Sequence, residues 1–432
     1  MIYKDLANKL INNFKILGAA KVAGGILSAL TLLIIGRTLG VEKFGLFSMV
    51  ISIVEICNIL LSFRIWDTSV KFVGSNLDNK EKISKYLALS FTLSMASSLI
   101  SFLFIIFIGG NFADGILKTD FSSKQLIASY AIIVLFISTN EIIDGILRVF
   151  DKYSYIFKIN TYTNLFRFTL ILALILKFDP NIQNIIYCFI GSYILSFILR
   201  IIFLSITLNE NRIQINFLKL PSYKSSIGFI KFMLNTHFSN MLNVANDKNL
   251  GVLAVGFIGS PYYAGLYRAA RAIVKIIRRI MDPVLEIIFP ELVKLYSEKN
   301  YELYKRIIFD STKILLIASA TLGVIIITFS NQIITLFFGP QFIESVLSMK
   351  ILVIAMIFHN LAYWVNPAIL SSGNPKFLTI TTVITTFIYC LSLPYLIDLM
   401  DHDGAAISLL IKNISTLTLG IVFYYKFLQN KN

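Results

Sequence analysis

The chain has 432 residues, of which 56% are hydrophobic and only 15% charged, and its formal net charge is +15. A soluble domain carries roughly a quarter of charged residues, so the composition excludes a soluble enzyme. It also excludes a nucleic-acid-binding protein, because no cluster of Lys and Arg lies on a folded soluble domain. The apolar positions suffice for about twelve membrane helices of roughly 20 residues each. We therefore predict an all-α, polytopic membrane protein.

Apolar runs of spanning length occur twelve times along the chain. The first follows three lysines but lacks a cleavage site, so we expect it to remain as a membrane helix. The three cysteines lie far apart inside such runs, and their spacing predicts neither a disulfide nor a metal site. The twelve predicted spans are Ile16–Ile35, Phe44–Phe63, Tyr86–Ile108, Leu126–Leu147, Ile159–Phe178, Ile185–Ile206, Phe232–Ile258, Tyr262–Phe289, Ile307–Phe329, Val346–Leu370, Phe377–Leu399 and Ala405–Phe427.

The Lys and Arg residues of the predicted loops indicate the orientation of the chain. On alternate loops, 20 basic residues fall on one side and 5 on the other. Basic residues concentrate in cytoplasmic loops, so both termini are predicted to be cytoplasmic. The remaining basic residues lie within or at the ends of the spans.

An internal repeat divides the spans into two halves. Gly36 with Phe44-Gly45-Leu46-Phe47 matches Gly256 with Ala264-Gly265-Leu266-Tyr267 at an offset of 220, and Gly145-Ile146-Leu147 matches Ala368-Ile369-Leu370 at an offset of 223. With six spans each, both halves insert the same way up, and such a pair encloses a cavity at its interface. We expect two six-helix lobes, residues 1–215 and 216–432, around a central cavity.

Charged residues inside the spans are the candidates for substrate binding. Each costs on the order of 2.5–3.5 kcal/mol at bilayer depth, so each should face a cavity or a partner. The eighth span carries a stripe of charges that share one helical face within roughly 100°. Its cytoplasmic end could reach the headgroups by snorkelling, whereas its first three members lie too deep for that. The stripe consists of Arg268, Arg271, Lys275, Arg278, Arg279, Asp282 and Glu286.

Other polar residues admit two interpretations. Asn240, Asn243, Asn246 and Asp247, followed by Lys248, either face the cavity or join helices by hydrogen bonds. Lys21 either faces the cavity or snorkels. Glu141, Asp144 and Arg148 are interpreted as a self-contained ion-pair cluster, and Arg167 and Lys412 either face the cavity or balance acids. The predicted substrate-binding residues are Arg268, Arg271, Lys275, Lys21, Asn243, Asp247 and Lys248.

The excess of basic groups indicates an anionic cargo. Arg and Lys in a confined cavity suit phosphate or diphosphate, and Arg can bind it in a bidentate manner. No motif for covalent chemistry accompanies them, so we expect no cofactor and no enzymatic activity. Proton or sodium coupling is left open, with Asp247 and Glu55 as available carboxylates.

Three short segments resemble one family of membrane transporters. Residues 36–48 (GRTLGVEKFGLFS) resemble the first periplasmic turn of the polysaccharide transporter family, the Wzx-type O-antigen flippases of the multidrug/oligosaccharidyl-lipid/polysaccharide exporter superfamily. Residues 265–270 (GLYRAA) resemble the corresponding turn of the second half, and residues 338–342 (FGPQF) resemble the turn after the ninth span. Span number and loop lengths extend the resemblance over nearly the whole chain.

This resemblance implies two six-helix lobes that alternate access to a central cavity. The substrate would be an undecaprenyl-diphosphate-linked oligosaccharide, an O-antigen or capsule repeat unit, moved from the cytoplasmic to the outer leaflet of the bacterial inner membrane. Expected partners are the bilayer, a polysaccharide polymerase and a chain-length regulator, with no nucleic acid. Two alternatives are a cation-coupled multidrug antiporter of the same superfamily, which should show cavity carboxylates, and a membrane polysaccharide polymerase or glycosyltransferase, which should show a long outer loop.

The charge asymmetry gives a topological prediction. Reporter fusions after Asn79 and Asn300 should both report the cytoplasm, because these positions lie in the lysine-rich loops. An alkaline phosphatase signal at either position would contradict the twelve-span arrangement.

Overall fold

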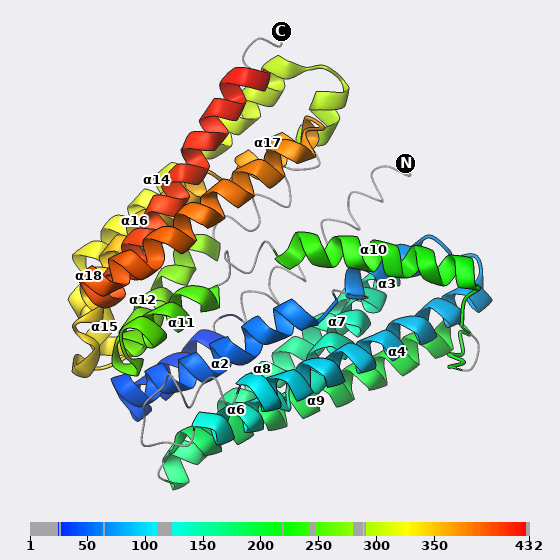
Figure 1. Ribbon diagram of the computed structural model, residues 1–432, viewed down its shortest axis with the longest axis horizontal. Coiled ribbons are helices and arrows are strands. Elements are labelled where there is room, and N and C mark those ends of the chain that lie inside the picture. The colour runs from blue at the N-terminus through cyan, green and yellow to red at the C-terminus, as the bar shows by residue number, and fades with distance from the viewer. Residues whose placement is uncertain are drawn as a thin grey trace. The chain divides into compact units, whose positions relative to one another are not determined.

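The computed structural model describes residues 25–428, apart from 26, 64, 110–122, 179, 218–219, 242–247, 280–287 and 289–290. This part of the chain is helical and contains no strand, which confirms the all-α prediction (Figure 1). The α-helices are α2 (Val41–Leu61), α3 (Ile65–Gly74), α4 (Lys80–Phe104), α6 (Ser123–Ala131), α7 (Val134–Val149), α8 (Tyr153–Lys177), α9 (Ile182–Glu210), α10 (Tyr223–Met241), α11 (Lys248–Ile258), α12 (Pro261–Arg279), α14 (Tyr301–Thr328), α15 (Ser330–Phe337), α16 (Ser345–Leu361), α17 (Val365–Ser371) and α18 (Pro375–Phe423).

Eight of the described helical segments are long and apolar enough to cross a membrane. The last of them, Lys376–Phe427, holds two helices joined at a kink, where Met400 and Asp401 leave the helical conformation. The chain reverses there, as Figure 1 shows for α18, and this matches the separate eleventh and twelfth spans of the sequence prediction. The protein is therefore a multi-pass membrane protein.

The chain forms two compact units. Unit 1 comprises residues 1–39 and 50–244, and unit 2 comprises 40–49 and 245–432. The helix α2 is thus divided between them, and α10 belongs to unit 1. The two lobes predicted from the sequence, 1–215 and 216–432, stay a prediction.

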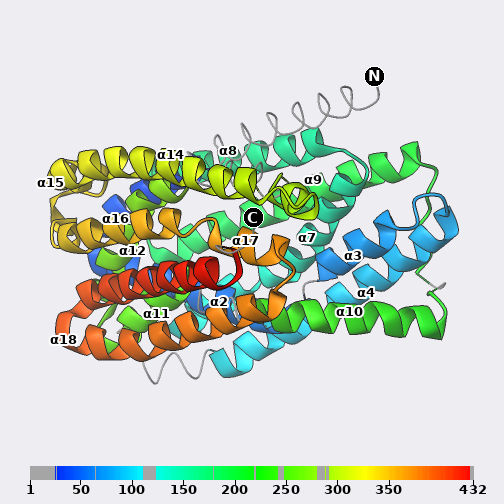
Figure 2. The same ribbon diagram turned by 90° about the horizontal axis from the view of Figure 1, so that it is seen from above.

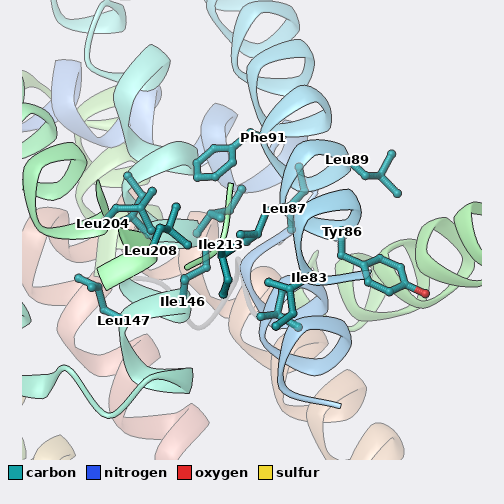
Figure 3. Packing of buried hydrophobic residues seen from close by; sticks show 14 of the residues in the cluster. Ile83, Tyr86, Leu87, Leu89, Phe91, Ile146, Leu147, Leu204, Leu208 and Ile213 are labelled. Atoms are coloured by element: carbon teal, nitrogen blue, oxygen red, sulfur yellow. The ribbon is translucent and has the colours of Figure 1, made fainter. Parts of the chain in front are cut away.

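The core of unit 1 is built from α3, α4, α7, α9 and α10. Aliphatic side chains of α4, α7 and α9 meet in its centre (Figure 3). Phe72 of α3 links this core to α10, since its ring centroid lies 5.1 Å from that of Tyr86 and 5.2 Å from that of Phe229. Such tilted aromatic pairs add about 0.5–1.5 kcal/mol to the burial of their area.

Small hydroxyl side chains let the helices of unit 1 approach closely. The Ser69 hydroxyl on α3 donates to that of Ser90 on α4 over 2.8 Å, and Ser94 on α4 lies 3.4 Å from Thr139 on α7. All four side chains are buried. Hydrogen bonds of this kind join helices where apolar burial alone gives little driving force between them, as in a lipid bilayer.

The seventh predicted span, Phe232–Ile258, contains residues of two helices, α10 and α11, and its residues 242–247 lie outside the described part of the chain. The helix α10 packs on α3, where the Lys71 ammonium lies 3.7 Å from the centre of the Phe232 ring. The continuity of this span stays a prediction.

The core of unit 2 is formed by α14, α16, α17 and α18, of which α14, α16 and α18 run side by side (Figure 2). Two buried tyrosines join elements of this core by hydrogen bonds. The hydroxyl of Tyr304 lies 2.8 Å from that of Ser371, and the hydroxyl of Tyr363 lies 2.6 Å from that of Ser311. Each pairing satisfies a phenol that would be costly to bury alone.

The first turns of α2 join unit 2 through an aromatic cluster. Phe44 lies with its ring centroid 5.9 Å from those of both Phe338 and Phe342, and all three side chains are fully buried. Phe338 and Phe342 flank Gly339, whose φ of +101° favours glycine. Two of the segments that carried the family resemblance, 36–48 and 338–342, are therefore packed against each other.

A close approach of backbones in unit 2 joins α2 to α12. A Cβ atom on Gly45 would lie 1.6 Å from the carbonyl oxygen of Pro261, and one on Gly265 would lie 2.1 Å from that of Val41. Gly45 and Gly265 are related by the offset of 220, and so are Val41 and Pro261. The contact is therefore reciprocal, as expected where two equivalent elements meet across a two-fold axis. We call it the Gly45–Gly265 crossing.

Substitution at this crossing should destabilise the protein. Gly45→Ala and Gly265→Ala place a methyl group against backbone that cannot rotate away, so α2 and α12 must separate, at a cost of about 1–3 kcal/mol or more. The midpoint of thermal unfolding in detergent should fall in both variants. Gly228→Ala is the control, because no atom lies within 4 Å of its would-be Cβ; there the midpoint should stay unchanged or rise, since Ala favours helix.

Candidate functional site

The helix α12 carries apolar side chains on one face and basic side chains on another. Its apolar side chains are buried against α11, α16 and α18. On the other face Arg268 and Arg271 are half-buried and Lys275 is exposed. The spacing of three and four residues thus places the three basic side chains on one side of α12.

Arg271 is held by an aromatic ring instead of a carboxylate. The carbon atom of its guanidinium lies 5.7 Å from the centre of the Tyr267 ring, and the Tyr267 side chain is fully buried. No described residue forms an ion pair or a hydrogen bond with Arg271. A cation over an aromatic face is stabilised without being neutralised, so its charge stays available to an anion.

A second cation also lies over a tyrosine ring. The Lys412 ammonium lies 5.0 Å from the centre of the Tyr389 ring, and both side chains are buried. The two tyrosines meet at Gly251 of α11, since a Cβ on Gly251 would be 3.0 Å from each of their hydroxyl oxygens. Helices α11, α12 and α18 therefore bring together two tyrosines and two cations. We call Arg271, Lys412, Tyr267 and Tyr389 the basic cluster.

The structure describes only part of the predicted substrate-binding set. Arg268, Arg271 and Lys275 lie together on α12, as given above. Lys21, Asn243 and Asp247 lie outside the described residues, and Lys248 is described only as the first residue of α11. The sequence signal for Lys412 was its isolation in an apolar span, but its place beside Tyr389 depends on tertiary packing.

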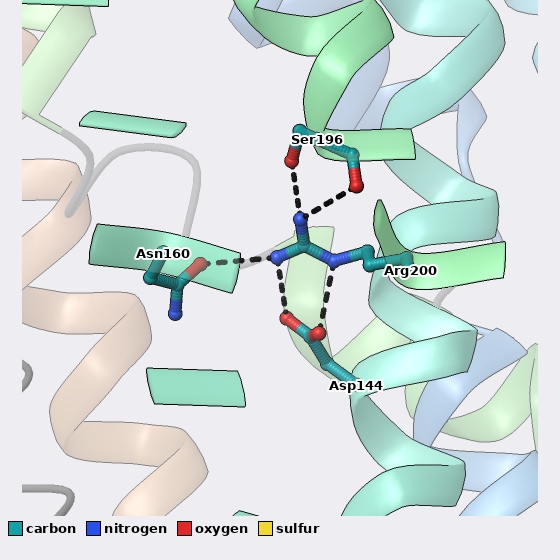
Figure 4. A network of polar contacts seen from close by, with 4 residues as sticks. All are labelled: Asp144, Asn160, Ser196 and Arg200. Atoms are coloured by element: carbon teal, nitrogen blue, oxygen red, sulfur yellow. Dashed lines mark hydrogen bonds and ion pairs between the residues drawn. The ribbon is translucent and has the colours of Figure 1, made fainter. Parts of the chain in front are cut away.

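Unit 1 contains a neutralised arginine that sequence analysis missed. Arg200 of α9 forms a bidentate ion pair with Asp144 of α7, with Nε–Oδ1 and Nη2–Oδ2 distances of 2.9 Å (Figure 4). Its Nη2 also donates to Oδ1 of Asn160 on α8 over 3.1 Å, and its Nη1 donates to Ser196. Arg200 is 6% exposed. With its charge balanced and its donors used, it joins α7, α8 and α9 and is not available to a ligand.

The expected ion-pair cluster of Glu141, Asp144 and Arg148 is therefore wrong. Asp144 pairs with Arg200, and the Arg148 guanidinium lies 5.6 Å from the centre of the Trp66 ring. Arg200 is preferred because its planar fork matches both carboxylate oxygens. A partner on the same helix was the only one that sequence spacing could suggest.

Breaking this pair should destabilise unit 1. Asp144→Ala leaves a buried guanidinium without a counter-charge, which costs about 3–5 kcal/mol, so the thermal midpoint in detergent should fall markedly. Asp144→Leu combined with Arg200→Met should recover most of the loss. Glu81→Ala, which breaks the exposed pair with Lys85, should change stability by less than about 1 kcal/mol. An equal effect of Asp144→Ala and Glu81→Ala would contradict the structural role.

The described helices define a multi-pass, all-helical membrane fold. The chain belongs to the polysaccharide biosynthesis protein family, whose model matches residues 10–296. This match confirms the family resemblance that the sequence motifs indicated. No curated protein matches the chain significantly in sequence.

Several solved structures share this fold. A multidrug resistance MATE family transporter of the MOP superfamily, in an inward-facing conformation, aligns with a TM-score of 0.75 at 14% identity, over 93% of each chain. The lipid II flippase MurJ, in an inward closed conformation, aligns with a TM-score of 0.74 at 15% identity, over 95% of this chain and 87% of that one. A mutant form of the Vibrio cholerae MATE transporter VcmN aligns with a TM-score of 0.67 at 14% identity, over 99% of this chain and 98% of that one.

Proposed function

We propose that the protein is a flippase for an undecaprenyl-diphosphate-linked oligosaccharide, an O-antigen or capsule repeat unit. It would move this lipid from the cytoplasmic to the outer leaflet of a bacterial inner membrane by alternating access, with both of its own termini in the cytoplasm. The observation that supports this most strongly is Arg271 of α12, a cation that lies over the Tyr267 ring and is paired with no described carboxylate. The family description, polysaccharide biosynthesis, agrees with such a cargo.

The chemistry of the basic cluster fits a diphosphate. Arg271 offers a planar fork for two phosphate oxygens, and Lys412 offers a compact positive charge. Arg268 and Lys275 extend the same face of α12. The diphosphate would be neutralised there while the polyprenyl chain stays in the lipid, so binding and release require no covalent step and no cofactor. Lys21, Asn243, Asp247 and Lys248 belong to the proposed site as well.

The sign of the charge separates this proposal from a multidrug antiporter of the same superfamily. A site for cationic drugs needs carboxylates, whereas the described charged side chains of the basic cluster are an arginine and a lysine. Proton or sodium coupling remains part of the proposal as the energy source. A polysaccharide polymerase and a chain-length regulator are the proposed protein partners, since a translocated repeat unit must then be polymerised.

Loss of Arg271 should abolish or sharply reduce glycan at the cell surface. Each lost contact between a charge and a phosphate costs about 1.5–3 kcal/mol, which is about ten- to a hundredfold in affinity. Arg271→Ala should therefore weaken binding of undecaprenyl diphosphate to the purified protein by this factor. Arg271→Lys should recover part of it, because the charge survives and the bidentate fork does not.

The control is Arg306→Ala. Arg306 is exposed near the start of α14, beside Asp310, and should have no effect on export. All variants must reach the membrane at the wild-type level. Normal glycan export by the triple variant Arg268→Ala, Arg271→Ala, Lys275→Ala would overturn the proposed function.

A further inference from the structure

The helix α16 is a common neighbour of the two helices that carry the cations of the basic cluster. It packs against α12, which bears Arg271, and against α18, which bears Lys412. It also packs against α14. All four helices belong to unit 2. The way in which α12 and α18 dock on α16 therefore sets where each cation lies.

A buried asparagine joins α16 to α12. The side-chain amide of Asn360 donates to the backbone carbonyl of Ile277 on α12 over 3.2 Å and to the hydroxyl of Ser319 on α14 over 2.7 Å. All three residues are fully buried. Ile277 follows Arg271 by six positions, roughly 9 Å along the helix axis. The bond thus holds α12 at one height and one rotation close to its basic residues.

A second buried asparagine joins α16 to α18. The side-chain amide of Asn413 donates to the backbone carbonyl of Ala355 on α16 over 2.8 Å, and Asn413 is 5% exposed. Asn413 directly follows Lys412 in the sequence. The bond therefore holds the stretch of backbone from which the Lys412 side chain extends. Each cation of the basic cluster is accordingly on a helix that an amide ties to α16.

These hydrogen bonds specify the register of the helices more sharply than apolar packing does. Apolar burial is non-directional, and three of the buried side chains on α12 are alanines, Ala264, Ala269 and Ala270, which interlock little with a neighbour. A hydrogen bond requires a narrow range of distance and direction. A single buried Asn is known to fix the register of paired helices at some cost in stability.

We propose that Asn360 and Asn413 are positioning residues of the basic cluster, which hold Arg271 and Lys412 in the arrangement that binds the lipid diphosphate. This inference rests on the proposed function and gives a role in it to two residues that touch no substrate. A charged donor must lie about 2.7–2.9 Å from a phosphate oxygen. A small shift of α12 or α18 therefore weakens binding while every charge is still present.

An apolar replacement of the same shape separates position from stability. Asn413→Leu leaves no buried group unsatisfied, because the Ala355 carbonyl keeps the hydrogen bond of its own helix. The midpoint of thermal unfolding in detergent should therefore stay at the wild-type value. Binding of undecaprenyl diphosphate to the purified protein, measured by titration, should weaken about tenfold.

A double-mutant cycle tests whether each amide acts through its cation. Asn413→Leu should weaken binding little further in a Lys412→Ala background, because the group that it positions is absent. Asn360→Leu should likewise add little to Arg271→Ala. The combined loss of affinity is then smaller than the product of the two single factors. A residue that only stabilises the fold would give the full product.

The matched control is Tyr304→Phe. It removes another hydrogen bond of a fully buried side chain in unit 2, the one between Tyr304 of α14 and Ser371 of α17. This variant should lower the thermal midpoint and bind undecaprenyl diphosphate with wild-type affinity, since it leaves α12 and α18 docked on α16.

The positioning role and the proposed function fail in different ways. Wild-type affinity in Asn360→Leu or Asn413→Leu, or losses that multiply in the cycle, would refute the positioning role of the residue concerned. A loss of affinity in Tyr304→Phe equal to that in Asn413→Leu would refute it too. Wild-type affinity in Arg271→Ala would instead refute the proposed function.

Discussion

The compensation of charged side chains in an apolar medium is the constraint on which the packing of this protein depends. A guanidinium at bilayer depth is costly unless something compensates it, and the protein uses two kinds of compensation. Arg200 has a carboxylate, an amide and a serine, and is thereby a fixed part of the scaffold. Arg167 and Arg271 have aromatic rings, which stabilise a cation and leave its charge in place. Arg148 also lies over a ring, that of Trp66, so an aromatic contact compensates a cation without by itself making a binding site.

Much of the fold was accessible from the sequence because apolar spans leave a strong one-dimensional signal. The helical class, most span positions and the common face of Arg268, Arg271 and Lys275 follow from hydropathy and helical period alone. The pairing of Asp144 with Arg200 was not accessible, because its partners are separated by 56 positions and only packing brings α7 and α9 together.

The two units differ in the chemistry that they offer. Unit 2 gathers Arg271 and Lys412 around buried tyrosines, whereas unit 1 holds Arg167 by the Ser192 hydroxyl and beside the rings of Phe189 and Tyr193. In unit 1, Arg200 is neutralised by Asp144.

The Gly45–Gly265 crossing has the symmetry of an interface between two copies of one surface. Gly45 meets the carbonyl of Pro261 while Gly265 meets that of Val41, and both pairs of positions share the offset of 220. Unit 2 accordingly includes residues 40–49, and a polypeptide that began with the second half would lack the helix on which α12 rests. A reciprocal interface is what a two-fold homodimer requires. The crossing therefore has the form of a subunit interface inside one covalent chain.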